Sequence, residues 1–133
     1  MFGRSIGVQA GKLEDLIPTL KKGLPVSSLH KLCLHMGVPE SRIATTVNIA
    51  QRTLTRRKSE GRFRPDESER LLRLARLFER AVEVMGSEPS AQKWFQSPVK
   101  GLGGKTPFEF ADTEPGARAV ENMLDRIEDG VFY

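Results

Sequence analysis

The sequence predicts an all-α protein of 133 residues. Apolar residues recur at spacings of three and four along most of the chain, which is the period of an amphipathic helix. Glycines follow these segments where a helix would end, and no stretch alternates apolar and polar residues as a half-buried strand does. We expect two helical parts, residues 1–65 and residues 66–133, with a long central helix joining them.

The formal net charge of +4 hides an uneven distribution of charge along the chain. Residues 1–80 hold 16 Lys and Arg against 8 Asp and Glu, whereas residues 81–133 hold 5 against 9. A basic segment collects on a polyanion, and an acidic segment is repelled by it. The distribution therefore predicts two different partners, one for each half of the chain.

The first helices are predicted from apolar spacing and from glycine stops. Residues 1–12 are rich in glycine and are expected to form a loose arm. A short helix is predicted over residues 13–22 and ends at Gly23, and a second over residues 26–36 ends at Gly37.

Residues 41–58 have the size and pattern of two short helices joined by a tight turn. Ala44 lies where the two helices must approach closely, and Leu54 is the expected buried anchor of the second helix, residues 50–60. Asn48 falls at the bend, where its tolerance of the left-handed conformation suits a sharp turn. The pattern predicts a helix-turn-helix, and the next segment, Phe63 to Asp66, is a connector.

The second helix of this pair is rich in side chains that can bond to base edges or phosphates in the major groove of duplex DNA. The alternative is a solvated helix face that binds nothing. In the DNA-binding interpretation Arg57 and Lys58 are supporting phosphate ligands. The full set of candidate contacts is Gln51, Arg52, Thr53, Thr55, Arg56, Arg57 and Lys58.

A long helix is predicted next, with Pro65 suited to its first turn and one continuous apolar stripe from Ser68 to Met85. Its arginines are most simply explained as members of surface ion pairs. A contact with the DNA backbone or with a partner is the alternative for them. The pairs predicted from spacing are Asp66–Arg70, Glu69–Arg73 and Arg80–Glu83.

Three further helix starts are predicted in the acidic half. Ser87 or Ser90 opens a short helix that carries Trp94, which we expect in the core, with a contact to a partner protein as the alternative. Thr106 to Glu109 form a capping box with proline at the first helical position. Thr113 starts a last helix with an apolar face, and Gly130 ends it.

The sequence offers no constellation of catalytic or metal-binding residues. Cys33 is the only cysteine, so it cannot form a disulfide within the chain, and it is expected to be a small buried apolar residue. His30 and His35 are five residues apart and lie on different faces of a helix, so they make a poor metal pair. We therefore expect no enzyme activity, cofactor or metal. No signal peptide or membrane span is apparent, so the expected location is the cytoplasm.

Each half of the chain carries motifs that occur together in one family of proteins. The N-terminal motifs are residues 52–58 (RTLTRRK) and 67–71 (ESERL), and the C-terminal motifs are Trp94-Phe95, 102–107 (LGGKTP), 113–117 (TEPGA) and 126–130 (RIEDG). These paired motifs resemble the Xre/MbcA/ParS family of antitoxins. The resemblance covers about residues 25–133, and Phe95 departs from it, since a leucine is more usual after the tryptophan.

The resemblance implies an antitoxin of a type II toxin–antitoxin system. Such a protein binds and neutralises a toxin, usually a RES-domain enzyme that consumes NAD, and represses its own operon by binding operator DNA. Members of the family are similar in forming homodimers. The part that follows residue 65 would then be the toxin-binding domain.

The acidic end of the chain is a candidate plug for such a toxin. A RES-type enzyme must bind the phosphates of a dinucleotide, so its substrate entrance should be cationic. The hypothesis is that carboxylates, including the terminal one, stand in for phosphate while two aromatic rings anchor the segment. A frayed terminus is the alternative. The candidate residues are Glu128, Asp129, Gly130, Val131, Phe132 and Tyr133.

Two other functions are compatible with the residues alone. The chain could be a one-component transcription regulator whose C-terminal half dimerises or senses a small molecule. It could also be an interaction protein whose helix pair no longer binds DNA.

Overall fold

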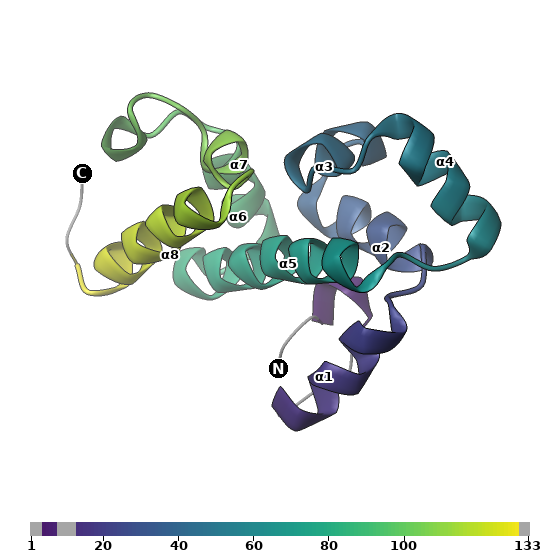
Figure 1. Cartoon of the computed structure of the whole chain (residues 1–133). Coiled ribbons are helices and arrows are strands. Elements are labelled where there is room, and N and C mark those ends of the chain that lie inside the picture. Colours follow the sequence, from purple (N-terminus) through teal and green to yellow (C-terminus); the bar gives the residue numbers. More distant parts are fainter. Residues whose placement is uncertain (1–3, 8–12, 131–133) are drawn as a thin grey trace. The chain divides into compact units, whose positions relative to one another are not determined.

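The computed structural model of the protein describes residues 4–7 and 13–130 (Figure 1). The named elements in these ranges are all helical, which confirms the predicted all-α class. The chain divides into two compact units, Met1–Arg76 and Leu77–Tyr133, and the division falls inside the long helix. The elements are η1 (Arg4–Ile6), α1 (Leu13–Lys22), α2 (Ser27–Met36), α3 (Glu40–Thr46), α4 (Gln51–Glu60), α5 (Pro65–Met85), α6 (Glu88–Phe95), η2 (Lys100–Leu102), α7 (Pro107–Phe110) and α8 (Glu114–Glu128).

The core of the N-terminal unit is formed by the apolar faces of α2, α3, α4 and the first half of α5. Ala44 and Leu54 are 2% and 1% exposed, so both occupy the interior as the helix-turn-helix pattern predicted. Full burial of a leucine side chain such as that of Leu54 contributes about 1.5–3 kcal/mol to stability. Other buried apolar residues of this unit are Leu29, Leu32, Met36, Ile43, Leu71, Leu74 and Ala75.

Asn48 forms the bend between α3 and α4. Its φ of 59° places it in the left-handed region, as predicted, and it is the one non-glycine residue with positive φ in the described part of the chain. The N–H of Ile49 donates to the Ala44 carbonyl at 2.8 Å, which closes the end of α3. Asparagine accepts this conformation more readily than other residues with a Cβ, so the turn is encoded locally.

The N-terminal arm is only partly as predicted. Residues Arg4–Ile6 form a 3-10 helix that packs against α2, and Ser5 and Ile6 are buried. The expectation of a loose arm is therefore wrong for this segment, because Ile6 supplies an apolar anchor that a glycine-rich composition obscures. The rest of the predicted arm lies outside the described residues.

The C-terminal unit packs α6, α7 and α8 with the second half of α5 around a cluster of phenylalanines. The ring of Phe95 lies edge-on to Phe78 at 6.0 Å and to Phe108 at 6.3 Å between centroids. Trp94, predicted in the core, is half-buried and touches Phe95 edge-on from outside. Phe95 is the central aromatic, because it faces α5 while its neighbour on the helix is turned toward the surface.

The helix starts in this unit follow the predicted caps. The hydroxyl of Ser87 accepts from the N–H of Ser90 at 3.2 Å at the start of α6. Thr106 and Glu109 form a reciprocal capping box at α7, and Thr113 caps α8. Caps of this kind each contribute about 1 kcal/mol. No helix within the described ranges has both the length and the apolar character needed to cross a membrane.

Gly23 joins α1 to the rest of the N-terminal unit in a conformation that requires glycine. Its φ is 93°, and a Cβ added there would collide with the carbonyl oxygen of Phe63. Arg62 donates to the Gly23 carbonyl at 2.8 Å, and the N–H of Leu24 donates to the Ser68 hydroxyl at 2.8 Å. The link between α1 and the start of α5 is therefore tightly packed.

We expect Gly23→Ala to lower the free energy of unfolding by about 3 kcal/mol, because it combines a left-handed alanine with a backbone collision. Gly61→Ala is the matched control, since Gly61 has a φ of 86° but no atom within 4 Å of the added Cβ. It should lose only about 1–2 kcal/mol. Urea unfolding of the two variants measures the difference, and equal losses would contradict the packing argument.

Candidate functional site

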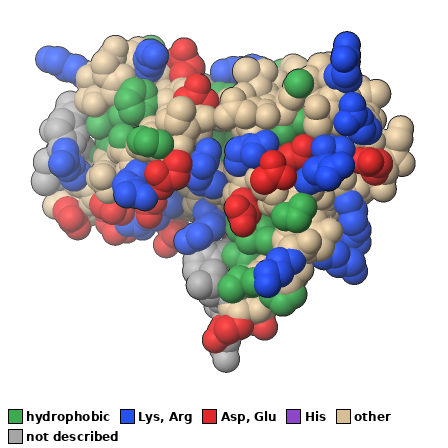
Figure 2. Space-filling view, in the orientation of Figure 1, with side chains coloured by type: hydrophobic (Ala, Val, Ile, Leu, Met, Phe, Trp, Pro, Cys, Tyr) green, Lys and Arg blue, Asp and Glu red, His purple; other side chains and the backbone are tan. Residues whose placement is uncertain are grey.

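The exposed face of α4 carries most of the predicted DNA contacts. Gln51, Arg52, Thr55 and Arg56 are exposed, while Leu54 on the opposite side is buried. Thr53 is half-buried at the edge of this face. Figure 2 shows Lys and Arg side chains over this part of the molecule. The outer face of α4 is therefore basic and rich in hydrogen-bond donors, while Leu54 on its inner face is packed in the core.

The first turn of α4 is open to solvent. Its N-cap residue is Ala50, which supplies no side-chain hydrogen bond to the free N–H groups there. An open groove of about 400 Å³ runs beside this turn, between α3 and α4. Free N–H groups at a helix start attract anions. The groove is lined by Ser41, Ala44, Thr45, Asn48, Ile49, Ala50 and Gln51.

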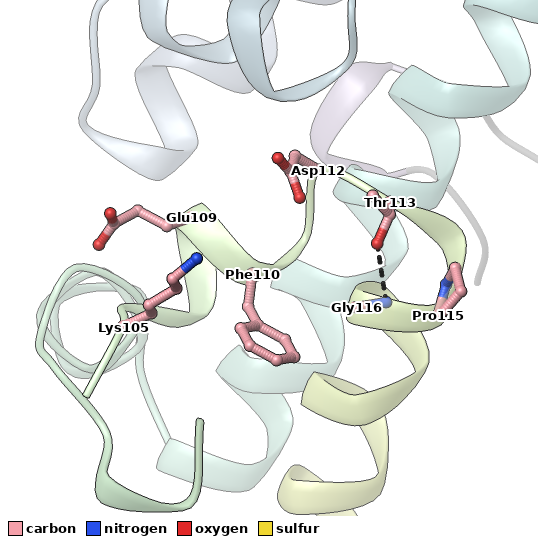
Figure 3. A pocket seen from close by; sticks show the side chains of 7 residues that line it. All are labelled: Lys105, Glu109, Phe110, Asp112, Thr113, Pro115 and Gly116. Atoms are coloured by element: carbon pink, nitrogen blue, oxygen red, sulfur yellow. Dashed lines mark hydrogen bonds between the residues drawn. The ribbon is translucent and has the colours of Figure 1, made fainter. Parts of the chain in front are cut away.

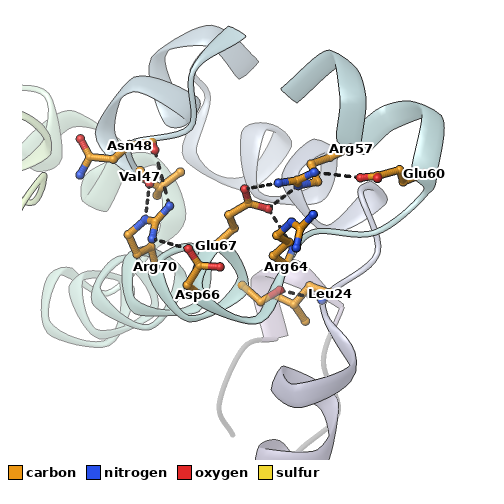
Figure 4. A network of polar contacts seen from close by, with 10 residues as sticks. Leu24, Val47, Asn48, Arg57, Glu60, Arg64, Asp66, Glu67 and Arg70 are labelled. Atoms are coloured by element: carbon orange, nitrogen blue, oxygen red, sulfur yellow. Dashed lines mark hydrogen bonds and ion pairs between the residues drawn. The ribbon is translucent and has the colours of Figure 1, made fainter. Parts of the chain in front are cut away.

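Arg57 is not on the exposed face of α4. Its side chain is 5% exposed, and its Nε donates to Glu67 Oε1 at 2.7 Å. Nη2 donates to the second Glu67 oxygen at 3.1 Å, and Nη1 donates to Glu60 at 2.9 Å (Figure 4). The expectation that Arg57 supports phosphate binding is therefore revised: its donors already serve two carboxylates, and it ties α4 to α5.

Glu67 is the acidic centre of this network. It also accepts from the N–H of Arg64 at 2.8 Å, which caps the start of α5. Burial alone would raise the pKa of the Glu67 carboxyl, but the hydrogen bonds from Arg57 and from the Arg64 N–H outweigh it and lower that pKa. The carboxylate stays ionised in the folded protein and holds Arg57 in place.

Arg70 holds the bend of the helix-turn-helix from α5. Its Nε donates to the Val47 carbonyl at 2.7 Å, at the end of α3, and Nη2 approaches the Asn48 carbonyl at 3.5 Å. The predicted ion pair with Asp66 is present at 3.4 Å. The end of α3 is thereby capped by a cation, which the negative end of a helix favours.

Lys58 is exposed but already has a partner. Its Nζ lies 2.9 Å from Glu40 on α3, and both side chains are at least one-third exposed, at 46% and 36%. An exposed pair of this kind contributes roughly 0–1 kcal/mol. Lys58 can therefore exchange Glu40 for a phosphate at little cost, unlike Arg57.

The acidic residues of α8 are organised by Arg80 of α5. Arg80 Nη2 lies 2.7 Å from Glu128 and 3.0 Å from Asp125, and hydrogen bonds from Arg80 lower the pKa of the Glu128 carboxyl. The predicted Arg80–Glu83 pair is therefore wrong, and the described α5 also lacks the predicted Glu69–Arg73 pair. Arg80 thus forms its ion pairs with carboxylates of α8 in place of Glu83 on its own helix.

The candidate plug is described only in part. Glu128 is held by Arg80, whereas Asp129 and Gly130 are exposed at the end of α8. The remaining candidates, Val131, Phe132 and Tyr133, lie outside the described residues. Figure 2 shows acidic side chains gathered along α8.

A small open pocket of about 310 Å³ lies beside the start of α8 (Figure 3). Phe110, half-buried, forms an apolar wall, and the hydroxyl of Thr113 accepts from the Gly116 N–H at 3.0 Å across its floor. No sequence pattern indicates this site, because Phe110 has the character of a core residue in a short helix. Its other lining residues are Lys105, Glu109, Asp112 and Pro115.

Two further features bear on possible chemistry, the arrangement of potential metal ligands and the thiol of Cys33. The described residues contain no group of three or more His, Cys, Asp or Glu side chains that could hold a metal ion. Cys33 is half-buried rather than fully buried, and burial raises the pKa of its thiol to about 11. A thiol with such a pKa is protonated at neutral pH and is a poor nucleophile.

The two units together define a class of protein: a basic helix-turn-helix unit followed by a small acidic helical unit. The N-terminal unit holds 15 Lys and Arg against 7 Asp and Glu, and the C-terminal unit 6 against 10. Residues 15–76 match the antitoxin Xre-like helix-turn-helix domain, and residues 80–130 match the antitoxin Xre/MbcA/ParS C-terminal toxin-binding domain.

Curated relatives agree with both matches. The chain is 37% identical over 131 residues to an "Antitoxin Xre" of Yersinia enterocolitica, covering 97% of this chain and 88% of that protein. It is 35% identical over 130 residues to an "Antitoxin Xre" of Photorhabdus laumondii, with 96% and 88% coverage. The chain belongs to the Xre/MbcA/ParS antitoxin family, whose members are not enzymes, and it combines a DNA-binding helix-turn-helix with a toxin-binding domain.

We expect Glu67→Gln to lower the free energy of unfolding near neutral pH by about 3 kcal/mol, because the buried Arg57 would keep only the half-exposed Glu60 as its counter-charge. The folded-state pKa of Glu67 lies below its ordinary value of 4.5. The ion pair therefore stabilises the wild type fully above that pH, and its contribution is lost as the pH falls through the lower, folded-state pKa.

Unfolding curves measured across the acidic range should show the gap between wild type and Glu67→Gln closing as the pH falls. Glu60→Gln is the matched control, since Glu60 binds the same arginine at 2.9 Å but is 50% exposed. It should cost less than about 1 kcal/mol. A gap that does not change with pH would count against the role given to Glu67.

Proposed function

We propose that this protein neutralises a RES-domain, NAD-consuming toxin and represses its own operon by binding operator DNA as a homodimer in the cytoplasm. The observation that carries the proposal is the division of charge and exposure between the two units. The donor-rich outer face of α4 belongs to the basic unit, and the exposed carboxylates at the end of α8 belong to the acidic one.

The DNA-binding surface is the outer face and the first turn of α4. Arginine can bond to guanine and glutamine to adenine in the major groove, and the open N–H groups of the first turn suit a phosphate. Arg57 holds the helix and is left out of the contact surface, and Lys58 contributes when it releases Glu40. The proposed contacts are Gln51, Arg52, Thr53, Thr55, Arg56 and Lys58.

The toxin-binding surface is the segment that follows α8. Asp129 is exposed at the start of this segment. Arg80 pairs with Asp125 and Glu128 and so holds the end of α8 against α5. We propose that carboxylates here occupy the phosphate sites of the toxin and that Phe132 and Tyr133 are buried anchors in the complex. Glu128, which is 51% exposed, joins them where a cation of the toxin replaces Arg80.

We expect Arg52→Ala and Arg56→Ala each to weaken operator binding by about 1–3 kcal/mol and to lower the salt dependence of binding by about one phosphate. Fluorescence anisotropy with operator DNA, titrated at several salt concentrations, measures both quantities. Arg118→Ala is the control, since Arg118 is an exposed arginine of the acidic unit that pairs with Glu114.

A wild-type protein that does not bind the operator would refute the repressor proposal. If both α4 variants bind the operator as tightly as the wild type, the DNA-binding surface lies outside this face of α4.

We expect deletion of residues 130–133 to weaken toxin binding by at least about 2 kcal/mol, roughly thirtyfold, because aromatic anchors would be lost. Asp129→Asn should weaken it by about 1.5–3 kcal/mol through loss of a charged hydrogen bond. Glu121→Gln is the control, since Glu121 is an exposed carboxylate in the middle of α8.

Growth rescue on co-expression with the adjacent toxin gene and calorimetry of the purified pair give the readouts. Full neutralisation by the shortened chain would end the plug hypothesis while leaving the antitoxin assignment intact.

A further inference from the structure

Thr55 lies in the middle of the exposed face of α4. Its neighbours on the helix surface are Gln51 and Arg52, one turn earlier, and Lys58 and Ser59, one turn later. All of these residues are exposed, and so is Thr55. A duplex that covers this face of α4 therefore meets Thr55 inside the contact and not at its edge.

The hydroxyl proton of Thr55 already has an acceptor within α4. Oγ1 donates to the Gln51 carbonyl at 3.0 Å. A threonine hydroxyl has a single proton, so this bond leaves Oγ1 with acceptor lone pairs only. A phosphate oxygen is also an acceptor, and Oγ1 can donate to it only by giving up the bond to Gln51.

The methyl group of Thr55 takes no part in that bond. The hydrogen bond draws Oγ1 back toward the preceding turn of α4, as is common for threonine in helices. Cγ2 is left as the apolar end of an exposed side chain. The group that Thr55 offers to a partner is therefore a methyl group.

The length of the side chain limits what it can reach on DNA. In the major groove the base edges lie opposite the inserted face of a helix, and the phosphates line the two borders of the groove. The long side chains of Arg52 and Lys58 can extend to a border. Threonine is short, so from the middle of the face it contacts only the base edges.

We propose that Thr55 determines operator specificity by packing its methyl group against the methyl group of a thymine. Thymine is the DNA base that presents a methyl group in the major groove, and the threonine methyl is suited to it. This assignment rests on the proposed function, because it gives one residue of the α4 surface its role in DNA recognition. It removes Thr55 from the phosphate ligands and makes it a reader of sequence.

The contact should be modest in strength but specific for one base. Loss of either methyl group should weaken binding about fourfold, the factor that corresponds to burial of one methyl-sized group. A phosphate contact would instead weaken binding to all sequences alike. Specificity and affinity therefore respond differently in the two cases.

Deoxyuridine substitution tests the contact, because it removes the methyl group of thymine and leaves its hydrogen-bonding groups unchanged. The probe is the duplex upstream of the protein's own gene that the full-length wild type protects from nuclease cleavage. Each thymine in it is replaced in turn, and fluorescence anisotropy gives the dissociation constant. We expect one position at which the wild type loses about fourfold in affinity.

Two variants separate the methyl group of Thr55 from its hydroxyl. Thr55→Ser keeps the hydroxyl, should bind the natural duplex about fourfold more weakly, and should no longer distinguish thymine from deoxyuridine at that position. Thr55→Val keeps a methyl group in the same place, so it should bind within about twofold of the wild type and keep the preference for thymine. Circular dichroism checks that both variants remain folded.

Thr45→Ser is the matched control. Thr45 is also exposed, and its hydroxyl makes the same bond, donating to the Ser41 carbonyl at 3.0 Å. It belongs to α3 and not to the outer face of α4. The Thr45→Ser variant should keep the wild-type preference for thymine at the position that Thr55 reads.

Three results would overturn the assignment. One is a scan in which no thymine preference depends on Thr55. Another is weaker binding by Thr55→Val with full binding by Thr55→Ser, which would give the hydroxyl a role on a phosphate or on a base amino group. The third is loss of the same preference in Thr45→Ser. A wild type that binds no upstream duplex would refute the repressor proposal along with this one, so the two failures are distinguishable.

Discussion

The buried ion pair between Arg57 and Glu67 fixes α4 on α5, and the direction of the DNA-binding face depends on it. Both side chains are nearly inaccessible, at 5% and 7% exposed, and they share two hydrogen bonds. An ion pair in this position stabilises little beyond an apolar pair, but either partner alone would be costly. The pair therefore favours one orientation of α4 on α5, because any other orientation would leave a buried charge without its partner.

The long helix α5 serves both units through its side chains. Glu67 and Arg70, near its start, hold α4 and the end of α3, while Arg80, one turn and a half from its end, holds the carboxylates of α8. Figure 4 shows how the first of these networks converges on one side of α5. Each proposed binding surface thus depends on a helix that α5 holds, α4 in one unit and α8 in the other, and the residues that support one are not those that support the other.

Exposure separates the cations that can bind DNA from those that build the fold. Arg52 and Arg56 are exposed on the outer face of α4, whereas Arg57 is buried one position later. A run of basic residues in a sequence therefore contains both kinds, because successive helical positions are turned about 100° from each other. For the carboxylates at the end of α8 the difference lies in their partners, since Asp129 and Glu128 are both exposed but Glu128 pairs with Arg80.

Local sequence accounts for the α-helices, the caps of α6, α7 and α8, the left-handed Asn48 and the family resemblance. These features depend on side chains within a few positions of one another, where periodicity and turn chemistry act. The partners of Arg57 and Arg80, the burial of Phe95 in place of Trp94 and the anchoring of Ile6 were decided only by tertiary structure. Each depends on contacts between residues distant along the chain, for example Arg80 with Glu128, and local spacing carries no information about which helices will meet.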